Sequence, residues 1–422
     1  MNNNWENIGI APADILVPRL EYRENFCVVA CDQFTSDPDY WEKTALLAGN
    51  SCSALHLIYP EIYLNNQPEE RIGRINRNMQ EYLDRDVFEE YPNSIIYVER
   101  TLSDGRVRKG LVLAADLEKY DYSPKSDSLI RATEGTIESR LPARIRIRQN
   151  APLELPHIML LIDDRKKTVI EPLAEARLTP VYDIPLMQGG GRVKGFLLDS
   201  DMQEKLFKAV SALADMTEYQ AKYSLNSPAA LLLYAVGDGN HSLASAKAYY
   251  EGLKKKLSPQ EALGHPARYA LVELVNLHDS SLVFEPIHRV LFNVKPDEIL
   301  NKLEQFCGFG ETGQYVEAVF NGQSRKLHFA RPVHQLAVGT LQKFLDEIIK
   351  DCAGAELDYI HEEETVRSLA AKEGNIGFIL SPMDKSELFK SVILDGPLPR
   401  KTFSMGSGRD KRYYLEARRI KP

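Results

Sequence analysis

Five consecutive residues, Gly237-Asp238-Gly239-Asn240-His241, combine the residue types that suit phosphate chemistry. They follow the continuous apolar run 228–236 and precede a segment in which apolar residues recur at helical spacing. The sequence therefore predicts a buried strand, a glycine turn and a helix that begins near Ser242. The N-terminus of a helix offers unpaired N–H groups and a partial positive charge, and glycines let a phosphate approach the backbone. At this turn we expect phosphate or nucleotide contacts from Gly237, Gly239, Asn240 and Ser242.

The two ionisable side chains of the turn have distinct expected roles. Asp238 would hold Mg²⁺ or accept a proton, and His241 would donate to a phosphate or stabilise a leaving group. A second interpretation is structural: the glycines make a tight turn, Asp238 or Asn240 caps the helix, and His241 has no role. We adopt the functional interpretation because these residues coincide where open α/β sheets bind ligands. The segment is not a Walker loop, because its spacing differs and the lysine is missing.

A second glycine-rich segment lies upstream, where Gly189, Gly190 and Gly191 are followed by Arg192. Three consecutive glycines are entropically costly unless the backbone passes close to something. Backbone amides together with a cation can wrap a phosphate, so Gly190, Gly191 and Arg192 are expected to bind a phosphate or to cover the site. A mobile surface loop explains the same composition, and both interpretations stay open.

Two segments in the C-terminal part of the chain add candidate anion contacts. His288 and Arg289 follow a strand-like segment and would complete the site from a second strand end. The alternative is a histidine with satisfied hydrogen bonds beside a surface arginine. Lys401 lies in a glycine-containing stretch and would reach the ligand from a C-terminal domain, but a solvated basic loop is the favoured explanation.

Several segments together resemble the family of uncharacterised proteins called DUF1015, along nearly the whole chain. They are ATEGT around Glu134, RIRQNAPLELPHIMLLIDD, GDGNHSLASAK, EPIHR and LPRK. Members of that family carry an Asp-Gly-His-His-Arg turn, which is similar to the phosphate-binding turn of the ParB and sulfiredoxin superfamily. That superfamily includes CTP-binding partition proteins and free-serine kinases. The chain differs from many relatives at Thr133, where they have histidine, and at Ser242, where they have arginine.

This resemblance implies a ParB-like nucleotide-binding core and a role for Glu134. By analogy with the kinases, Glu134 is the candidate base that accepts the proton of a substrate hydroxyl, a role that needs a carboxylate near the transferred phosphoryl group. The alternative is an ion pair with one of the arginines that surround Glu134 in the sequence. Both interpretations stay open at this point.

Local patterns predict the elements that position these residues. Asp104-Gly105 between two alternating segments predicts a hairpin over 94–114, because such a turn tolerates positive φ at both residues. Residues 157–162 are typical of a buried strand, and residues 200–223 predict a long helix. Further helical patterns cover residues 68–91, 335–352 and 362–371. The expected fold class is α/β with mixed α+β character.

The length of 422 residues predicts two or three domains. We expect a ParB-like α/β core over residues 1–290, in which the hairpin and the glycine-rich loop are insertions. A C-terminal α/β domain is expected over residues 291–422. The oligomeric state does not follow from the sequence.

Composition narrows the class of protein. The net charge of −8 argues against a general nucleic-acid-binding protein, because affinity for the phosphate backbone needs a basic face. Five scattered cysteines form neither a disulfide framework nor a zinc signature, which favours a reducing compartment. The sequence has no signal-peptide pattern and no apolar run near the ~18 residues that span a bilayer. We expect a cytoplasmic protein without a membrane partner.

The function expected from these observations is a nucleotide-dependent phosphotransferase that uses Mg²⁺ and ATP or ADP and acts on a small hydroxyl compound such as serine. Its partners would be the nucleotide and the small-molecule substrate, without nucleic acid. The first alternative is a nucleotide-binding regulatory protein without turnover. The second is a metal-dependent hydrolase, such as a phosphatase, that uses Asp238, His241 and His288 around one ion.

Overall fold

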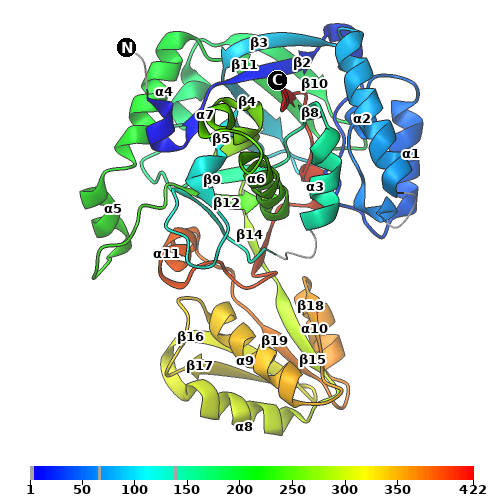
Figure 1. Ribbon diagram of the computed structural model, residues 1–422. Helices are drawn as coiled ribbons and strands as arrows, with labels where there is room; N and C mark the ends of the chain where they lie inside the picture. Colours follow the sequence, from blue (N-terminus) through cyan, green and yellow to red (C-terminus); the bar gives the residue numbers. More distant parts are fainter. Residues whose placement is uncertain (1–3, 65–67, 137–140) are drawn as a thin grey trace. The chain divides into compact units, whose positions relative to one another are not determined.

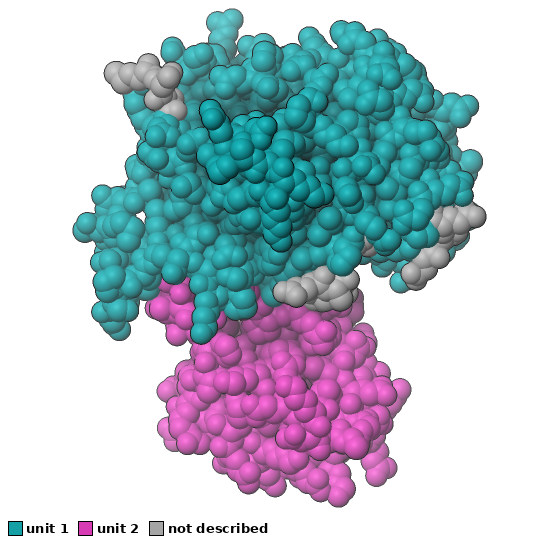
Figure 2. All heavy atoms as spheres, in the orientation of Figure 1, with its two compact units in different colours: residues 1–282, 407–422 teal, residues 283–406 magenta. Residues whose placement is uncertain are grey.

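The computed structural model describes the chain except residues 1–3, 65–67 and 137–140, and its residues form two compact units (Figures 1 and 2). The first unit comprises Met1–Leu282 together with Ser407–Pro422, and the second comprises Val283–Gly406. The sequence predicted a domain boundary between residues 290 and 291, whereas the boundary between the two units lies between residues 282 and 283. The C-terminal segment returns to the first unit, which no local pattern could indicate because the return depends on contacts with distant parts of the chain.

A ten-stranded mixed sheet is the centre of the first unit (Figure 1). Its strands, in spatial order, are β10 (Thr179–Pro185), β11 (Arg192–Leu197), β4 (Ile96–Thr101), β5 (Val107–Asp116), β13 (Tyr269–Asn276), β9 (Met159–Ile162), β12 (Tyr234–Asp238), β7 (Ile130–Ala132) and β6 (Tyr120–Asp121), with β1 (Ile10–Ala11) paired to β5. The pairs β13–β9, β12–β7 and β6–β7 are parallel, and the others are antiparallel. The expected α/β class with mixed α+β character is confirmed.

Both faces of this sheet are buried, because alternate side chains of a strand point to opposite faces. Ile96 and Val98 pack into one core with residues of α1 (Pro38–Ala48) and α2 (Pro68–Asp84). Tyr97, between them, packs into the other core with residues of α4 (Ser200–Ala212) and α6 (Asn240–Lys254). The remaining helices of this unit are α3 (Leu141–Asn150), α5 (Met216–Tyr223) and α7 (Pro259–Gly264). The long apolar strands are thus explained by a sheet covered on both sides.

The hairpin predicted around Asp104-Gly105 is confirmed as the antiparallel pair β4–β5. Its turn differs from the expected one. Only Gly105 has positive φ, at 87°, and its N–H donates to the carbonyl of Leu102. The N–H of Leu102 donates to the carbonyl of Arg106, which makes a three-residue loop that ends in a left-handed glycine, not a two-residue turn.

Three other element predictions need correction. The helix expected over 200–223 is divided into α4 and α5, because the carboxylate of Asp215 accepts from the N–H groups of Thr217 and Glu218 and starts a new helix. The helical pattern over 68–91 ends at Asp84, and β3 (Phe88–Ser94) follows and pairs with β2 (Ala13–Pro18). The apolar run 228–236 is regular strand only from Tyr234.

The second unit contains a five-stranded antiparallel sheet. Its strands, in spatial order, are β17 (Gln323–Phe329), β16 (Phe309–Phe320), β19 (Ile376–Ile379), β15 (His288–Phe292) and β18 (Glu356–Ile360). A short ribbon pairs β14 (Phe284–Pro286) with β20 (Phe403–Met405). The helices are α8 (Pro296–Cys307), α9 (Ala337–Asp351), α10 (Glu363–Ala370) and α11 (Lys385–Asp395). The helices predicted over 335–352 and 362–371 are confirmed. Across the described part of both units, no helix has the length and apolarity to cross a membrane.

The returning C-terminal segment is built into the core of the first unit. Ala417 forms an antiparallel bridge with Leu16, and β21 (Arg418–Arg419) pairs with β8 (Leu153–Glu154). The side chain of Arg418 is 8% exposed and donates to the carboxylate of Glu154 at 2.9 Å. This buried ion pair ties the end of the chain to the interior, since a buried charge needs a partner of good geometry.

Neighbouring arginines of β21 offer a matched test of this anchoring. We expect Arg418→Met to lower the free energy of unfolding by about 3 kcal/mol, since it removes one partner of a buried pair. The same change at Arg419, whose pair with Glu90 is about half exposed, should cost less than about 1 kcal/mol. Urea denaturation of both variants measures the difference, and equal losses would contradict the anchoring role.

A buried carboxyl group in the same segment should make stability depend on pH. Burial raises the pKa of Glu416 from 4.5 to about 7, although Tyr182 hydrogen-bonds to it. The folded state therefore holds this proton more tightly, and the stabilisation is complete below pH 4.5 and lost as the pH rises through 7. We expect the stability of Glu416→Gln relative to wild type to increase by about 3 kcal/mol from pH 4.5 to pH 8. Urea unfolding at both pH values tests this, and a pH-independent difference would contradict it.

Candidate functional site

The turn and Glu134 meet at one edge of the central sheet. Strands β7 and β12 are parallel neighbours, with Ala132 opposite Val236, so both strands end at the same edge. Thr133 follows β7, and its hydroxyl donates to the carbonyl of Val236 at 2.5 Å. Glu134 comes next in the chain. The parallel pairing thus brings the predicted base and the predicted phosphate-binding turn to one place, although they are far apart in the sequence.

Gly239 gives the turn its shape. Its φ of 77° and ψ of 26° are left-handed, and a Cβ at this position would lie 3.0 Å from Cγ1 and 3.1 Å from the backbone Cα of Ile158. Both features require glycine. Gly239 is the N-cap of α6, which begins at Asn240, two residues before the predicted start near Ser242.

The glycines make the tight turn of the structural interpretation, but the N-cap of α6 is Gly239, so neither Asp238 nor Asn240 occupies the N-cap position. The carboxylate of Asp238 accepts from the N–H of Gly239 at 2.9 Å. The buried amide of Asn240 accepts from the N–H of Thr133 at 3.2 Å and so joins the turn to the end of β7. The positive end of a fifteen-residue helix therefore faces the edge where Asp238 lies.

Lys411, from the returning C-terminal segment, provides the positive charge that pairs with the acidic side chain of the turn. Its ammonium group lies 3.2 Å from the carboxylate of Asp238, and the two side chains are 25% and 23% exposed. Burial alone would lower the pKa of Lys411, but Asp238, Asp32 and Glu134 together raise it. Lys411 is therefore protonated and interacts with three carboxylates. No sequence pattern singled it out, because its role depends on the return of the chain.

The acidic groups outnumber this cation. Asp32 is mostly desolvated, which would raise its pKa, but His157, Gln33 and Lys411 together lower it, so the group is ionised. Three carboxylates thus interact with one ammonium group and with the imidazole of His157, a cluster in which acidic groups are the most numerous and which can accommodate a further cation. A phosphate would enter this site most easily together with a divalent metal ion.

The donor set suits Mg²⁺ that is shared with a ligand. Among the residues that the structure describes, no group of three or more His, Cys, Asp or Glu is arranged to hold a metal by itself. Mg²⁺ commonly binds through one or two carboxylates plus substrate phosphates and retains several waters. Asp238, the predicted metal ligand, fits this mode.

A serine–histidine pair extends the site along α6. The hydroxyl of Ser242 lies 3.0 Å from Nε2 of His157. His157 is the first residue of the strand predicted at 157–162, and the observed strand β9 begins two residues later, at Met159. The ring of His157 packs edge-on against Tyr413, with centroids 4.9 Å apart. Both members of the pair line a cavity of about 570 Å³. His157 was not predicted as a site residue, because no spacing links it to a serine 85 residues away. His241 lies in the first turn of α6 and is half-buried.

The glycine-rich loop closes the hairpin of β10 and β11. A Cβ at Gly191, whose φ is 81°, would lie 2.1 Å from the carbonyl oxygen of Thr101, and one at Gly190 would meet the guanidinium of Arg412. Close packing against the protein itself therefore explains these glycines. Arg192 pairs with Asp183 at 2.5 Å on the surface. Phosphate binding by this loop stays a prediction.

The remaining predicted contacts belong to the second unit. Nδ1 of His288 accepts from the N–H of Leu380 at 3.1 Å. Arg289 is fully buried and donates to the side chain of Gln342 at 3.1 Å and to the carbonyl of Lys401 at 3.0 Å. These contacts agree with the alternative in which His288 has satisfied hydrogen bonds. That alternative placed Arg289 on the surface, however, whereas the structure buries it. The structure groups these residues with one another, and their role in ligand binding stays a prediction.

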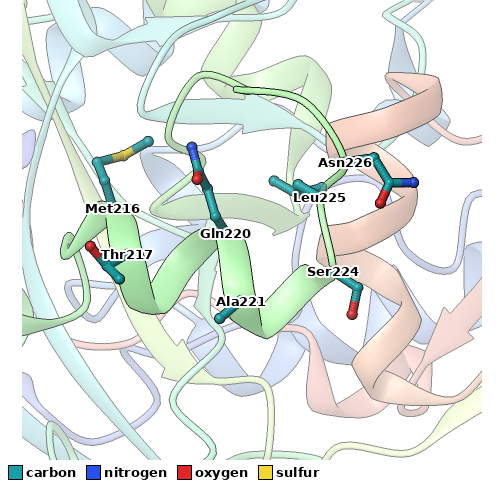
Figure 3. A pocket seen from close by; sticks show the side chains of 7 residues that line it. All are labelled: Met216, Thr217, Gln220, Ala221, Ser224, Leu225 and Asn226. Atoms are coloured by element: carbon teal, nitrogen blue, oxygen red, sulfur yellow. The ribbon is translucent and has the colours of Figure 1, made fainter.

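A second hollow, of about 510 Å³, lies along α5 and the segment after it (Figure 3). Its lining residues are Met216, Thr217, Gln220, Ala221, Ser224, Leu225 and Asn226. They include no ionisable group and none of the predicted site residues.

Comparisons with known proteins identify a family but no activity. No curated protein matches the chain. Among solved structures, a conserved hypothetical protein from Pyrococcus furiosus matches with a TM-score of 0.35 and 11% identity, over 74% of this chain and 95% of that one. A free serine kinase variant in complex with AMP matches with a TM-score of 0.38 and 13% identity, over 75% and 92%. SbnI from Staphylococcus aureus, truncated at its C-terminus, matches with a TM-score of 0.35 and 12% identity, over 70% and 82%.

These structural similarities are low, and they carry no argument about what the chain binds or does. The family model is different, since it matches residues 15–418, which is almost the entire sequence. The resemblance noted from the sequence motifs is thereby confirmed. The chain belongs to the DUF1015 family, described as a protein of unknown function.

Proposed function

We propose that the edge formed by β7 and β12 is the active site of a nucleotide-dependent phosphotransferase that acts on a hydroxyl compound. The observation that carries this proposal is the pairing of Asp238 with Lys411 at the N-terminus of α6, whose N-cap is Gly239, beside the strand end that bears Glu134. Phosphoryl transfer requires little covalent chemistry from the protein and depends on positioning and charge stabilisation. A carboxylate, an ammonium group and a helix N-terminus in one place supply both.

Each group has a defined task in this scheme. The glycine backbone at Gly237 and Gly239 lets phosphate oxygens approach the first N–H groups of α6, with His241 as a further donor. Asp238 would hold Mg²⁺, which would neutralise the charge of the phosphate groups. Lys411 keeps the carboxylates in place in the absence of the nucleotide and stabilises negative charge on the transferred group. The supporting evidence is its raised pKa, caused by Asp238, Asp32 and Glu134 against the effect of burial.

Glu134 is the base of the proposed reaction. Its carboxylate takes the proton of the acceptor hydroxyl as that oxygen bonds to the terminal phosphorus of the nucleotide. The bond from this phosphorus to the bridging oxygen breaks, and the shortened nucleotide leaves with the electron pair. The products are the phosphorylated compound and the shortened nucleotide, so no covalent enzyme intermediate is needed. The donor is ATP or ADP.

Removing the charge of Asp238 tests the nucleotide site. At ligand concentrations about 100 times Kd, a bound nucleotide stabilises the folded state by about 2.7 kcal/mol. We expect ATP or ADP with Mg²⁺ to raise the Tm of the wild-type protein, and Asp238→Asn to abolish most of this rise because the metal loses its ligand. Asp183→Asn, which changes an exposed aspartate paired with Arg192, is the matched control and should keep the full shift. The absence of any shift in the wild-type protein would refute the proposal.

Replacing Glu134 separates binding from chemistry. We expect Glu134→Gln to keep the nucleotide-dependent rise in Tm but to lower the turnover of nucleotide with a hydroxyl acceptor about 10² to 10⁴-fold, the usual contribution of a general base. Phosphorus NMR of the nucleotide and product measures the turnover. Nucleotide binding without turnover in the wild-type protein, across a panel of alcohol acceptors, would favour the regulatory alternative instead.

A further inference from the structure

The cavity beside α6 is large and mainly apolar. Its volume is about 570 Å³, which lies within the range of roughly 300 to 1,000 Å³ that is typical of small-molecule sites. Aliphatic side chains from separate segments form its walls, among them Ile72 and Met79 of α2, Ile147 of α3, Leu155 and Leu271. All of them belong to the first unit. Such walls stabilise a ligand by removing apolar surface from water.

The charged residues around this cavity are arranged in pairs. Arg144 pairs with Glu61 and Arg148 pairs with Glu154 within the lining, and Arg146, which also lines the cavity, pairs with Glu69 outside it. Every arginine of the lining therefore has a carboxylate partner. The arginines are thus engaged by carboxylates, and the aliphatic walls suit an uncharged group.

One end of the cavity is polar and adjoins the proposed phosphate site. Ser242 and His157, 3.0 Å apart, both line the cavity. Ser242 is also in the first turn of α6, three residues after Gly239 at its N-cap. A molecule with its apolar part in the cavity would thus present a polar end at the turn that carries Asp238.

From this continuity we infer that the cavity binds the apolar body of the hydroxyl substrate, while Ser242 and His157 hydrogen-bond its hydroxyl. The inference rests on the proposed function for the identity of the substrate. The substrate class is then an alcohol with an aliphatic or aromatic body, larger than serine. A single CH₂OH group would leave most of the cavity walls without contacts, so such a ligand would forgo most of the available stabilisation.

A homologous series of linear alcohols, from 1-butanol to 1-octanol, tests the cavity directly and without nucleotide. Each added CH₂ group that enters an apolar site should tighten binding about fourfold, until the cavity is filled and the affinity stops rising. Ligand-observed NMR titration of the wild-type protein measures the dissociation constants. Affinities that do not depend on chain length would overturn the inference.

Two substitutions of Ile147, which is half-buried on α3, locate the binding site. Ile147→Trp fills the cavity, so we expect the longest alcohols to bind at least tenfold more weakly. Ile147→Ala enlarges it and should move the plateau to longer alcohols. The control is Leu213→Trp, a half-buried position at the end of α4 that does not line the cavity and should leave the whole series unchanged.

The outcomes separate this inference from the proposed function. Unchanged binding in a folded Ile147→Trp protein would overturn the inference, whatever the nucleotide measurements show. If Ile147→Trp fails to fold, the shift of the plateau in Ile147→Ala decides, and no shift overturns it. Chain-length-dependent binding that responds to Ile147 supports the cavity as an alcohol site, even if no nucleotide raises the Tm and the phosphotransferase proposal falls.

Discussion

The ion pair between Lys411 and Asp238 is the contact on which the organisation of the site depends. It joins the turn before α6 to a segment that follows the whole second unit in the sequence. Without the ammonium group, three carboxylates would remain close together in a partly desolvated place, and their mutual repulsion would destabilise the folded edge. The returning C-terminal segment therefore has two effects. It packs into the core of the first unit, and it places the ammonium group of Lys411 beside the carboxylates.

The geometry of the sheet places the other groups. Parallel pairing of β7 with β12 sets the ends of both strands at one edge, and the amide of Asn240 fastens the turn to the neighbouring strand end. Gly239 lets the chain reverse into α6 in the space left by Ile158. These contacts are short and mostly buried, so they fix the position of the N-terminus of α6, and such preorganisation is what charge-stabilising sites require.

Helix α6 contributes residues both to the polar turn at its N-terminus and to the apolar cavity. Its N-terminus offers partial positive charge next to carboxylates and a lysine, and the hydroxyl of Ser242 faces a cavity with apolar walls. A polar reaction centre next to an apolar compartment is the usual design of small-molecule sites, in which apolar contacts provide affinity and a few polar groups fix orientation. The arginines around the cavity are each paired with a carboxylate.

The sequence by itself determined what depends on neighbouring residues. Local periodicity and turn chemistry predicted the strand, glycine turn and helix around Asp238, the hairpin at Gly105, and the helices at 337–351 and 363–370. Sequence motifs indicated the family. Only the tertiary structure decided that Lys411, Asp32 and His157 belong beside that turn, and that the glycine-rich loop packs against the protein itself. The positions of these residues depend on contacts between segments that are far apart in the sequence or belong to separate elements. Their physical cause is the burial of both faces of one sheet and the pairing of charges that this burial enforces, which no local pattern encodes.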